Sequence, residues 1–201
     1  ENLAYKKNGF DDFFFGRLRS LINIGHGKVG WMTASYRPVY TPHTTSSPFG
    51  NIFFSAYIGP LLREDARNLI IIPGKAFNHI FSDEDVNFII KFAGRLPFSL
   101  KKASRLLYMS ILERKYGQAA YIHTSNEFER LMKEHYNFQY EGLLKEERTA
   151  LCKVVNGDSA HADIDTLLLL ESYGFIEKLD EDYQVLGEAL EHYIRNRCKN
   201  Q

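Results

Sequence analysis

Two strand-like runs stand near the start of the chain, and their number limits what this region can form. Residues 28–35 have the pattern of a strand that is buried on both faces of a parallel sheet. Residues 51–58 are a second, aromatic run that ends at Gly59-Pro60. A stable sheet usually needs three or more strands. We therefore expect further strands from upstream sequence, or a partner, and interpret the chain as a piece of a longer protein.

The remaining segments have helical patterns. The segment before the first run has apolar residues at 10, 13, 14, 18, 21 and 22, which is helical spacing and completes an α/β layer. Capping boxes at Ser82 and Thr124, and Pro97 as a first helical residue, mark further helix starts. These signals predict helices over 62–72, from 83 to Gly94, from Pro97 to Gly117, and from 124 to about 135.

The last 60 residues have a pattern of their own. Helices are predicted over 146–155 and 164–173, and the alternating stretch "FIEKLDEDYQVL" predicts a β-hairpin with an acidic turn. A final helix covers 188–197. Helix, helix, hairpin, helix is the order of a winged helix-turn-helix. We expect residues 167–170 to be largely buried, with any remaining apolar face docked on residues 60–140.

Composition and cysteine usage narrow the class of protein. Hydrophobic residues make up 44% and charged residues 25%, which is ordinary for a soluble globular protein. No apolar run approaches the roughly 20 residues that span a bilayer, so we expect no membrane association. Cys152 and Cys198 form no ligand cluster. We expect neither a disulfide nor a zinc site, interpret Cys152 as a buried thiol, and predict a cytoplasmic location.

The charge of the chain is unevenly distributed although its net charge is zero. Residues 146–201 carry 6 basic and 12 acidic residues, a net of −6, so the remainder carries +6. Opposite charges of equal size favour two units that face each other.

Taken in order, these segments resemble the downstream part of bacterial AAA+/STAND-type P-loop ATPases. "FDDFFFGRLRSLIN" is similar to the helix after the Walker B strand, and "VGWMTASYRP" to the sensor strand. "SSPFGNIF" and "IGPLLREDARNLI" are similar to the final core strand and the helix after it. "FSDEDVNFIIKFAGRLPFSLKKAS" is similar to the helical lid with its Gly-x-x-Pro turn, and the tail to the winged helix behind the lid.

The resemblance implies the fold class and the domain boundaries. We expect a helix-rich chain with an α/β piece, the C-terminal part of a P-loop-type parallel sheet, over residues 1–61. A helical lid would follow over 62–140 and a winged-helix domain over 141–201.

The resemblance also implies a nucleotide site. The sensor strand would place Thr33, Ser35 and Arg37 beside the γ-phosphate, where a cation stabilises phosphoryl transfer. The alternative is that the Thr33 and Ser35 hydroxyls only form hydrogen bonds at the end of the strand, and that Arg37 is a surface cation. Pro97, after Gly94 in the lid turn, would pack near the adenine. The alternative there is a plain helix boundary, with Gly94 as cap and Pro97 as start.

The phosphate-binding loop itself is missing from this sequence. Neither Gly27-Lys28 nor Gly74-Lys75 fits G-x-x-x-x-G-K-[ST], and a Walker B strand is also missing. The histidines are scattered, with no metal-binding spacing. We therefore expect no metal site, no catalytic residue and no ATP hydrolysis by this chain alone, and no tightly bound cofactor. The resemblance implies ATP with Mg in the parent protein.

The winged-helix candidate does not have the charges of a DNA reader. Residues 163–173 contain three acids, no Lys or Arg, and a run of leucines, and the predicted wing tip is Asp180-Glu181-Asp182. Phosphates require cations, so we do not expect duplex DNA as a ligand. The expected partners are proteins or upstream domains of the same parent, and an oligomer is left open.

Two functions remain. The first is a fragment of an ATP-binding AAA+/STAND-type regulatory ATPase, in which sensor strand, lid and winged helix couple the nucleotide state to partner domains. The alternative is a non-catalytic winged-helix protein-interaction module with a degenerate α/β piece.

Overall fold

The computed structural model describes residues 58–76 and 81–199, together with residues 16, 17, 19–21, 24, 30, 32 and 56. The chain divides into two compact units, residues 1–57 and 58–201. The predicted site residues Thr33, Ser35 and Arg37 lie outside the described residues.

The predicted strands over 28–35 and 51–58 also lie mostly outside the described residues. At Gly30, Met32, Ala56 and Ile58, the positions that are described, no strand is found. The Met32 side chain is 98% exposed. The strand prediction is therefore wrong at these four residues, and the P-loop-type sheet stays a prediction.

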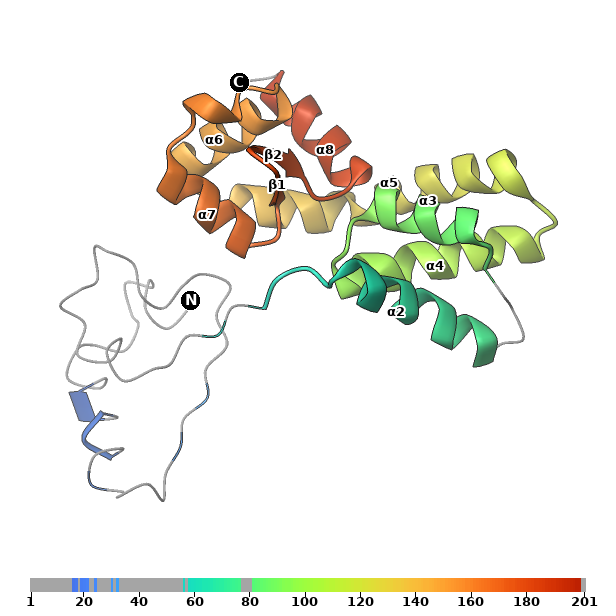
Figure 1. The fold of residues 1–201 in the computed structure, drawn as a ribbon, viewed down its shortest axis with the longest axis horizontal. Helices are drawn as coiled ribbons and strands as arrows, with labels where there is room; N and C mark the ends of the chain where they lie inside the picture. Colours follow the sequence, from blue (N-terminus) through green and yellow to red (C-terminus); the bar gives the residue numbers. More distant parts are fainter. Residues whose placement is uncertain are drawn as a thin grey trace. The chain divides into compact units, whose positions relative to one another are not determined.

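The second unit is rich in helices and contains a small antiparallel sheet (Figure 1). The helix-rich character that we predicted for the chain is thus found in this unit. Its elements are α2 (Arg63–Ala76), α3 (Asp83–Ala93), α4 (Pro97–Leu112), α5 (Gly117–Glu141), α6 (Lys145–Val155), the short 3-10 helix η3 (Ser159–His161), α7 (Ile164–Ser172), β1 (Ile176–Leu179), β2 (Asp182–Val185) and α8 (Glu188–Cys198).

The helix α5 supplies one side of the core. Its buried residues recur every four positions, which places them in a single stripe along the helix. This stripe packs against α4, whose buried residues include Leu100 and Leu107, and against α8. The members of the α5 stripe are Ala120, Thr124, Phe128, Met132, Tyr136 and Tyr140.

The capping box at Ser82 is confirmed. The Ser82 hydroxyl accepts a hydrogen bond from the Asp85 N–H at 3.1 Å, and the Asp85 carboxylate accepts one from the Ser82 N–H at 2.9 Å. The predicted helix start at Thr124 is wrong, because α5 runs unbroken through this residue from Gly117. Thr124 is fully buried, and its hydroxyl lies 3.3 Å from the Ser110 hydroxyl. The Thr124 hydroxyl, which would accept a hydrogen bond in a cap, is therefore used in a contact between α5 and α4.

Two helix ends differ from the prediction. The helix α2 continues through Pro73 to Ala76, although we predicted its end at residue 72. A proline in the last turn removes one backbone N–H, and the buried stripe of Ala66, Ile70 and Gly74 continues past it. The helix α4 ends at Leu112 and not at Gly117, and Gly117 begins α5.

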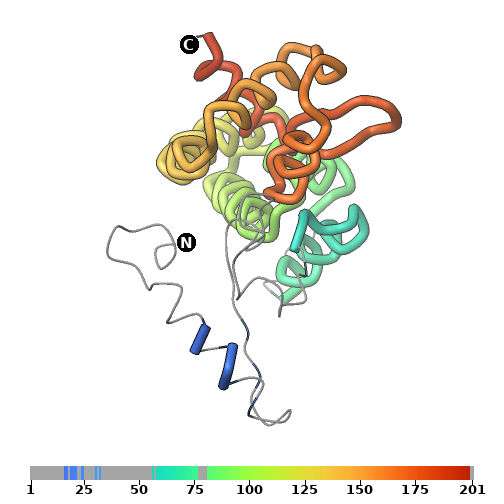
Figure 2. Tube along the Cα trace, turned by 90° about the vertical axis from the view of Figure 1, so that its left-hand side faces the viewer, coloured from blue at the N-terminus to red at the C-terminus, as the bar shows by residue number. Residues whose placement is uncertain are grey.

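The C-terminal elements follow the predicted order of helix, helix, hairpin, helix. Strands β1 and β2 pair in antiparallel register, with Ile176 opposite Val185 and Leu179 opposite Asp182. The hairpin projects from the neighbouring helices (Figure 2, red-orange). The helix α8 ties this group to α5, because Tyr193 donates a hydrogen bond to Asn137 at 3.2 Å.

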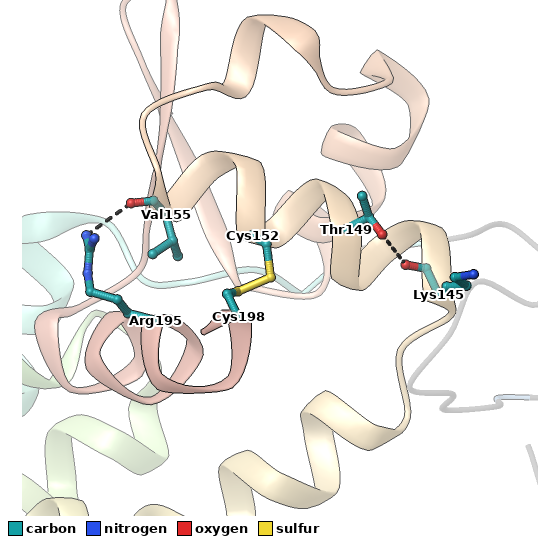
Figure 3. The surroundings of a disulfide bond; sticks show 6 residues. All are labelled: Lys145, Thr149, Cys152, Val155, Arg195 and Cys198. Carbon is teal, nitrogen blue, oxygen red and sulfur yellow. Dashed lines mark hydrogen bonds between the residues drawn. A yellow bond between two sulfur atoms is a disulfide. The ribbon is translucent and has the colours of Figure 1, made fainter. Parts of the chain in front are cut away.

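The two cysteines form a disulfide, Cys152–Cys198, which joins α6 to the last residue of α8 (Figure 3). Their Cα atoms lie 5.7 Å apart, within the normal range for such a bond. The prediction of no disulfide, and of a thiol at Cys152, is therefore wrong. A separation of 46 residues in sequence gave no sign of the pairing. We predicted a reducing compartment partly because we expected the two cysteines to be unpaired, and the disulfide removes this argument.

The leucine run of α7 is buried only in part. Leu167 and Leu170 belong to the core, as predicted. The Leu168 side chain is 51% exposed and that of Ile164 55%, so this apolar face is not docked on residues 60–140, which corrects the prediction. Among the helices of the described residues, none has the length and apolarity needed to cross a membrane.

Candidate functional site

The turn between α3 and α4 contains two predicted site residues, Gly94 and Pro97. Gly94 ends α3 with φ 75° and ψ −168°, a region that is essentially restricted to glycine, and its N–H donates to the Ile90 carbonyl at 3.1 Å. Pro97 is the first residue of α4, where its missing N–H leaves no hydrogen bond unmade. The local geometry is thus the helix boundary that the sequence offered as the alternative to a nucleotide contact.

The turn also makes a close backbone contact with the end of the hairpin. A Cβ on Gly94 would lie 2.6 Å from the Leu186 carbonyl oxygen, and a Cβ on Gly187 would lie 2.5 Å from the Gly94 nitrogen. Gly187 has φ 95°, so both positions use backbone conformations that suit glycine. Two main chains that are 93 positions apart in sequence are therefore in direct contact, with no side chain between them.

Arg95 connects this turn to two other segments. Its guanidinium donates a hydrogen bond to the Leu61 carbonyl at 2.5 Å and forms an ion pair with Glu177 of β1. The Leu61 N–H donates in return to the Arg95 carbonyl at 3.0 Å. Both charged side chains are 21% exposed. The charge of Arg95 is thus already neutralised by a carboxylate 82 residues away.

The cavity behind the turn is too small for a nucleotide. It measures about 10 Å³, which is room for roughly one water molecule. Its walls come from the turn, α5 and the segments that flank the hairpin, and include Leu96, Tyr136 and Leu186. His135 also lines it, and burial, helped by the charge of Lys102, lowers the pKa of this imidazole. Small-molecule sites usually have several hundred Å³, so this cavity is a packing gap.

An open groove of about 290 Å³ lies between α6 and the start of α7. Two of the charged groups that line it, Lys153 and Asp163, have partners: Lys153 donates to the His161 carbonyl at 2.5 Å. Asp163 accepts from the N–H and the hydroxyl of Thr166, and these bonds lower the pKa of its carboxyl group. In the part of the chain that the structure describes, no group of three His, Cys, Asp or Glu residues could hold a metal ion.

Comparison with known proteins gives no relative. No protein-family model matches the chain, and no curated protein or solved structure matches it. The resemblance to AAA+/STAND ATPases therefore rests on the sequence segments quoted above.

The structure brings Gly94 and Pro97 together in one turn, while it does not describe Thr33, Ser35 and Arg37. Sequence reasoning missed Glu177 and Gly187 as partners of this turn. The only signal for Gly187 was its place between the hairpin and the last helix, where a glycine is an ordinary break.

Proposed function

We propose that this chain is part of an AAA+/STAND-type regulatory ATPase, in which the α3–α4 turn couples the nucleotide state to a C-terminal winged helix. One observation carries the proposal: a single turn is in backbone contact with Gly187 and holds both Leu61 and Glu177 through Arg95. A ligand that moved this turn would have to move the hairpin as well, because closely packed backbones do not deform independently.

The chemistry of such a protein would come from other parts of the parent. ATP and Mg would be held by a P-loop and a Walker B strand outside this sequence, and this chain would supply no catalytic residue. The parent would act where ATP is present, in the cytoplasm. Alkylation of Cys152 and Cys198 in cell extracts would measure how much of the disulfide persists there.

Two measurements test the proposal. The coding sequence that precedes residue 1 should contain a P-loop within about the usual length of a domain. A protein that includes it should bind ATP with Mg, and hydrogen exchange in β1 and β2 should change on binding. In that protein Glu177→Gln, which removes the ion pair with Arg95, should reduce the change in the hairpin and leave ATP binding intact. Absence of the P-loop, or a hairpin that does not respond to bound ATP, would refute it.

A second candidate, a non-catalytic protein-interaction module, is favoured by a different observation. Ile164 and Leu168 are half-exposed on α7, among carboxylates that would repel DNA. A winged helix that binds protein through this surface needs no nucleotide. Titration of duplex DNA into the chain at low salt should show no tight binding.

A further inference from the structure

The helix α7 and the hairpin tip both expose acidic residues, and α7 also exposes apolar side chains. Ile164 and Leu168 lie one helical turn apart and are both about half exposed, and Asp165 neighbours Leu168 on the same side. Residues 157–187 contain eight acids and one lysine, a net charge of −7 with the histidine neutral. We define the acidic face as Ile164, Asp165, Leu168, Asp180 and Glu181.

The helix α4 presents the opposite surface. Its outward residues follow each other at intervals of three and four, which places them in one stripe, and all of them are exposed. The helix contains three cations and no acid. Among the described residues no ion pair is found for Lys101 or Arg105. We define the basic stripe as Phe98, Lys101, Arg105, Met109 and Leu112.

The two surfaces are opposite in charge, and each combines its charge with exposed apolar side chains. Within one copy the residues of both surfaces are exposed, and α4 and α7 are separate helices of the second unit (Figure 1). Each surface therefore keeps its apolar area in water unless a second molecule covers it.

We propose that the acidic face of one copy docks on the basic stripe of a second copy, in a head-to-tail contact. The charges exclude contacts between like surfaces: two acidic faces repel each other, and so do two basic stripes. A head-to-tail contact leaves one free surface at each end, so that further copies can add to form a ring or a filament. The faces of two helices and a hairpin tip are small for an interface, so the contact should be weak and sensitive to salt.

The test uses the full chain and two variants that each remove one surface. Asp165→Asn/Leu168→Gln removes the acidic face, and Lys101→Gln/Arg105→Gln removes the basic stripe. Lys75→Gln/Lys133→Gln is the matched control, since it removes two exposed cations of α2 and α5 outside the stripe. Circular dichroism confirms that each variant is folded. Sedimentation over a range of concentrations, at low and high salt, measures association.

The wild type and the control should grow beyond dimers as concentration rises, and high salt should reverse this. Each variant alone should associate at least tenfold more weakly. An equimolar mixture of the two variants should form a heterodimer and stop there, because only one acidic face and one basic stripe remain to pair. A wild type that stays monomeric, one that stops at a dimer, or association that neither variant weakens would overturn the proposal. The contact needs no nucleotide, so its failure would leave the proposed ATPase function untouched.

Discussion

Replacing Gly94 by alanine should destabilise the second unit strongly. The new Cβ would lie 2.6 Å from the Leu186 carbonyl oxygen and 3.1 Å from the carbonyl carbon, both backbone atoms that no rotamer change can move. The backbone of Gly94 would also have to keep φ 75° and ψ −168°, or the turn into α4 would change direction.

The two effects can be estimated separately. A side chain in this region of φ and ψ costs about 1–3 kcal/mol. Forcing a methyl group into a packed site costs about 1–3 kcal/mol through displacement of its neighbours. Gly94→Ala should therefore lower the free energy of unfolding by about 2–6 kcal/mol.

Urea unfolding followed by circular dichroism measures this loss, with Gly157→Ala as control. Gly157 also has a positive φ, 74°, but nothing lies within 4 Å of its added Cβ, so the control isolates backbone strain, about 1 kcal/mol. The double variant Gly94→Ala/Gly187→Ala should lose less than the sum of its single variants, because separating the two backbones once relieves both overlaps. A Gly94→Ala variant as stable as the control would show that the backbones are not in contact.

Three further outcomes are expected. Reduction of Cys152–Cys198 opens a covalent loop that spans a separation of 46 residues, and chain entropy predicts a loss of about 4 kcal/mol, to be measured by urea unfolding with and without a reductant. Ser82→Ala should lose about 1 kcal/mol with its cap, while Ser125→Ala within α5 should change stability little. The lowered pKa of His135 means that the unfolded state binds more protons below pH 6.5, so stability should fall as the pH drops through that value. His135→Gln should flatten this part of the pH profile, and an unchanged profile would contradict the assignment.

Local signals in the sequence predicted local structure well. The capping box at Ser82, the proline start at Pro97 and the hairpin after Gly174 all depend on residues within a few positions of each other, and all are found. The same capping pattern failed at Thr124, because the pattern cannot tell an exposed hydroxyl from one that is buried against Ser110.

The contacts that define the candidate site could not be predicted in this way. Arg95 pairs with Glu177, and Gly94 meets Gly187, across more than 80 positions of sequence. A single sequence gives no pattern that identifies such pairs, because it does not show which of the many carboxylates or glycines lies next to Arg95 or Gly94 in the fold. The disulfide belongs to the same class, and only the packing of α6 against α8 brings its cysteines together.

The disulfide also decides how the C-terminal elements respond to mechanical force. The bond connects α6 directly to the end of α8, so tension applied at Lys199 passes from Cys198 to Cys152. Without the bond, the chain between the two cysteines, which are separated by 46 positions, could extend to about 160 Å. While the bond is intact, the force does not act on this segment. The helix α7 and the hairpin lie inside this shielded segment. A pull on the tail would therefore detach α6 and α8 together and leave the acidic face folded between them.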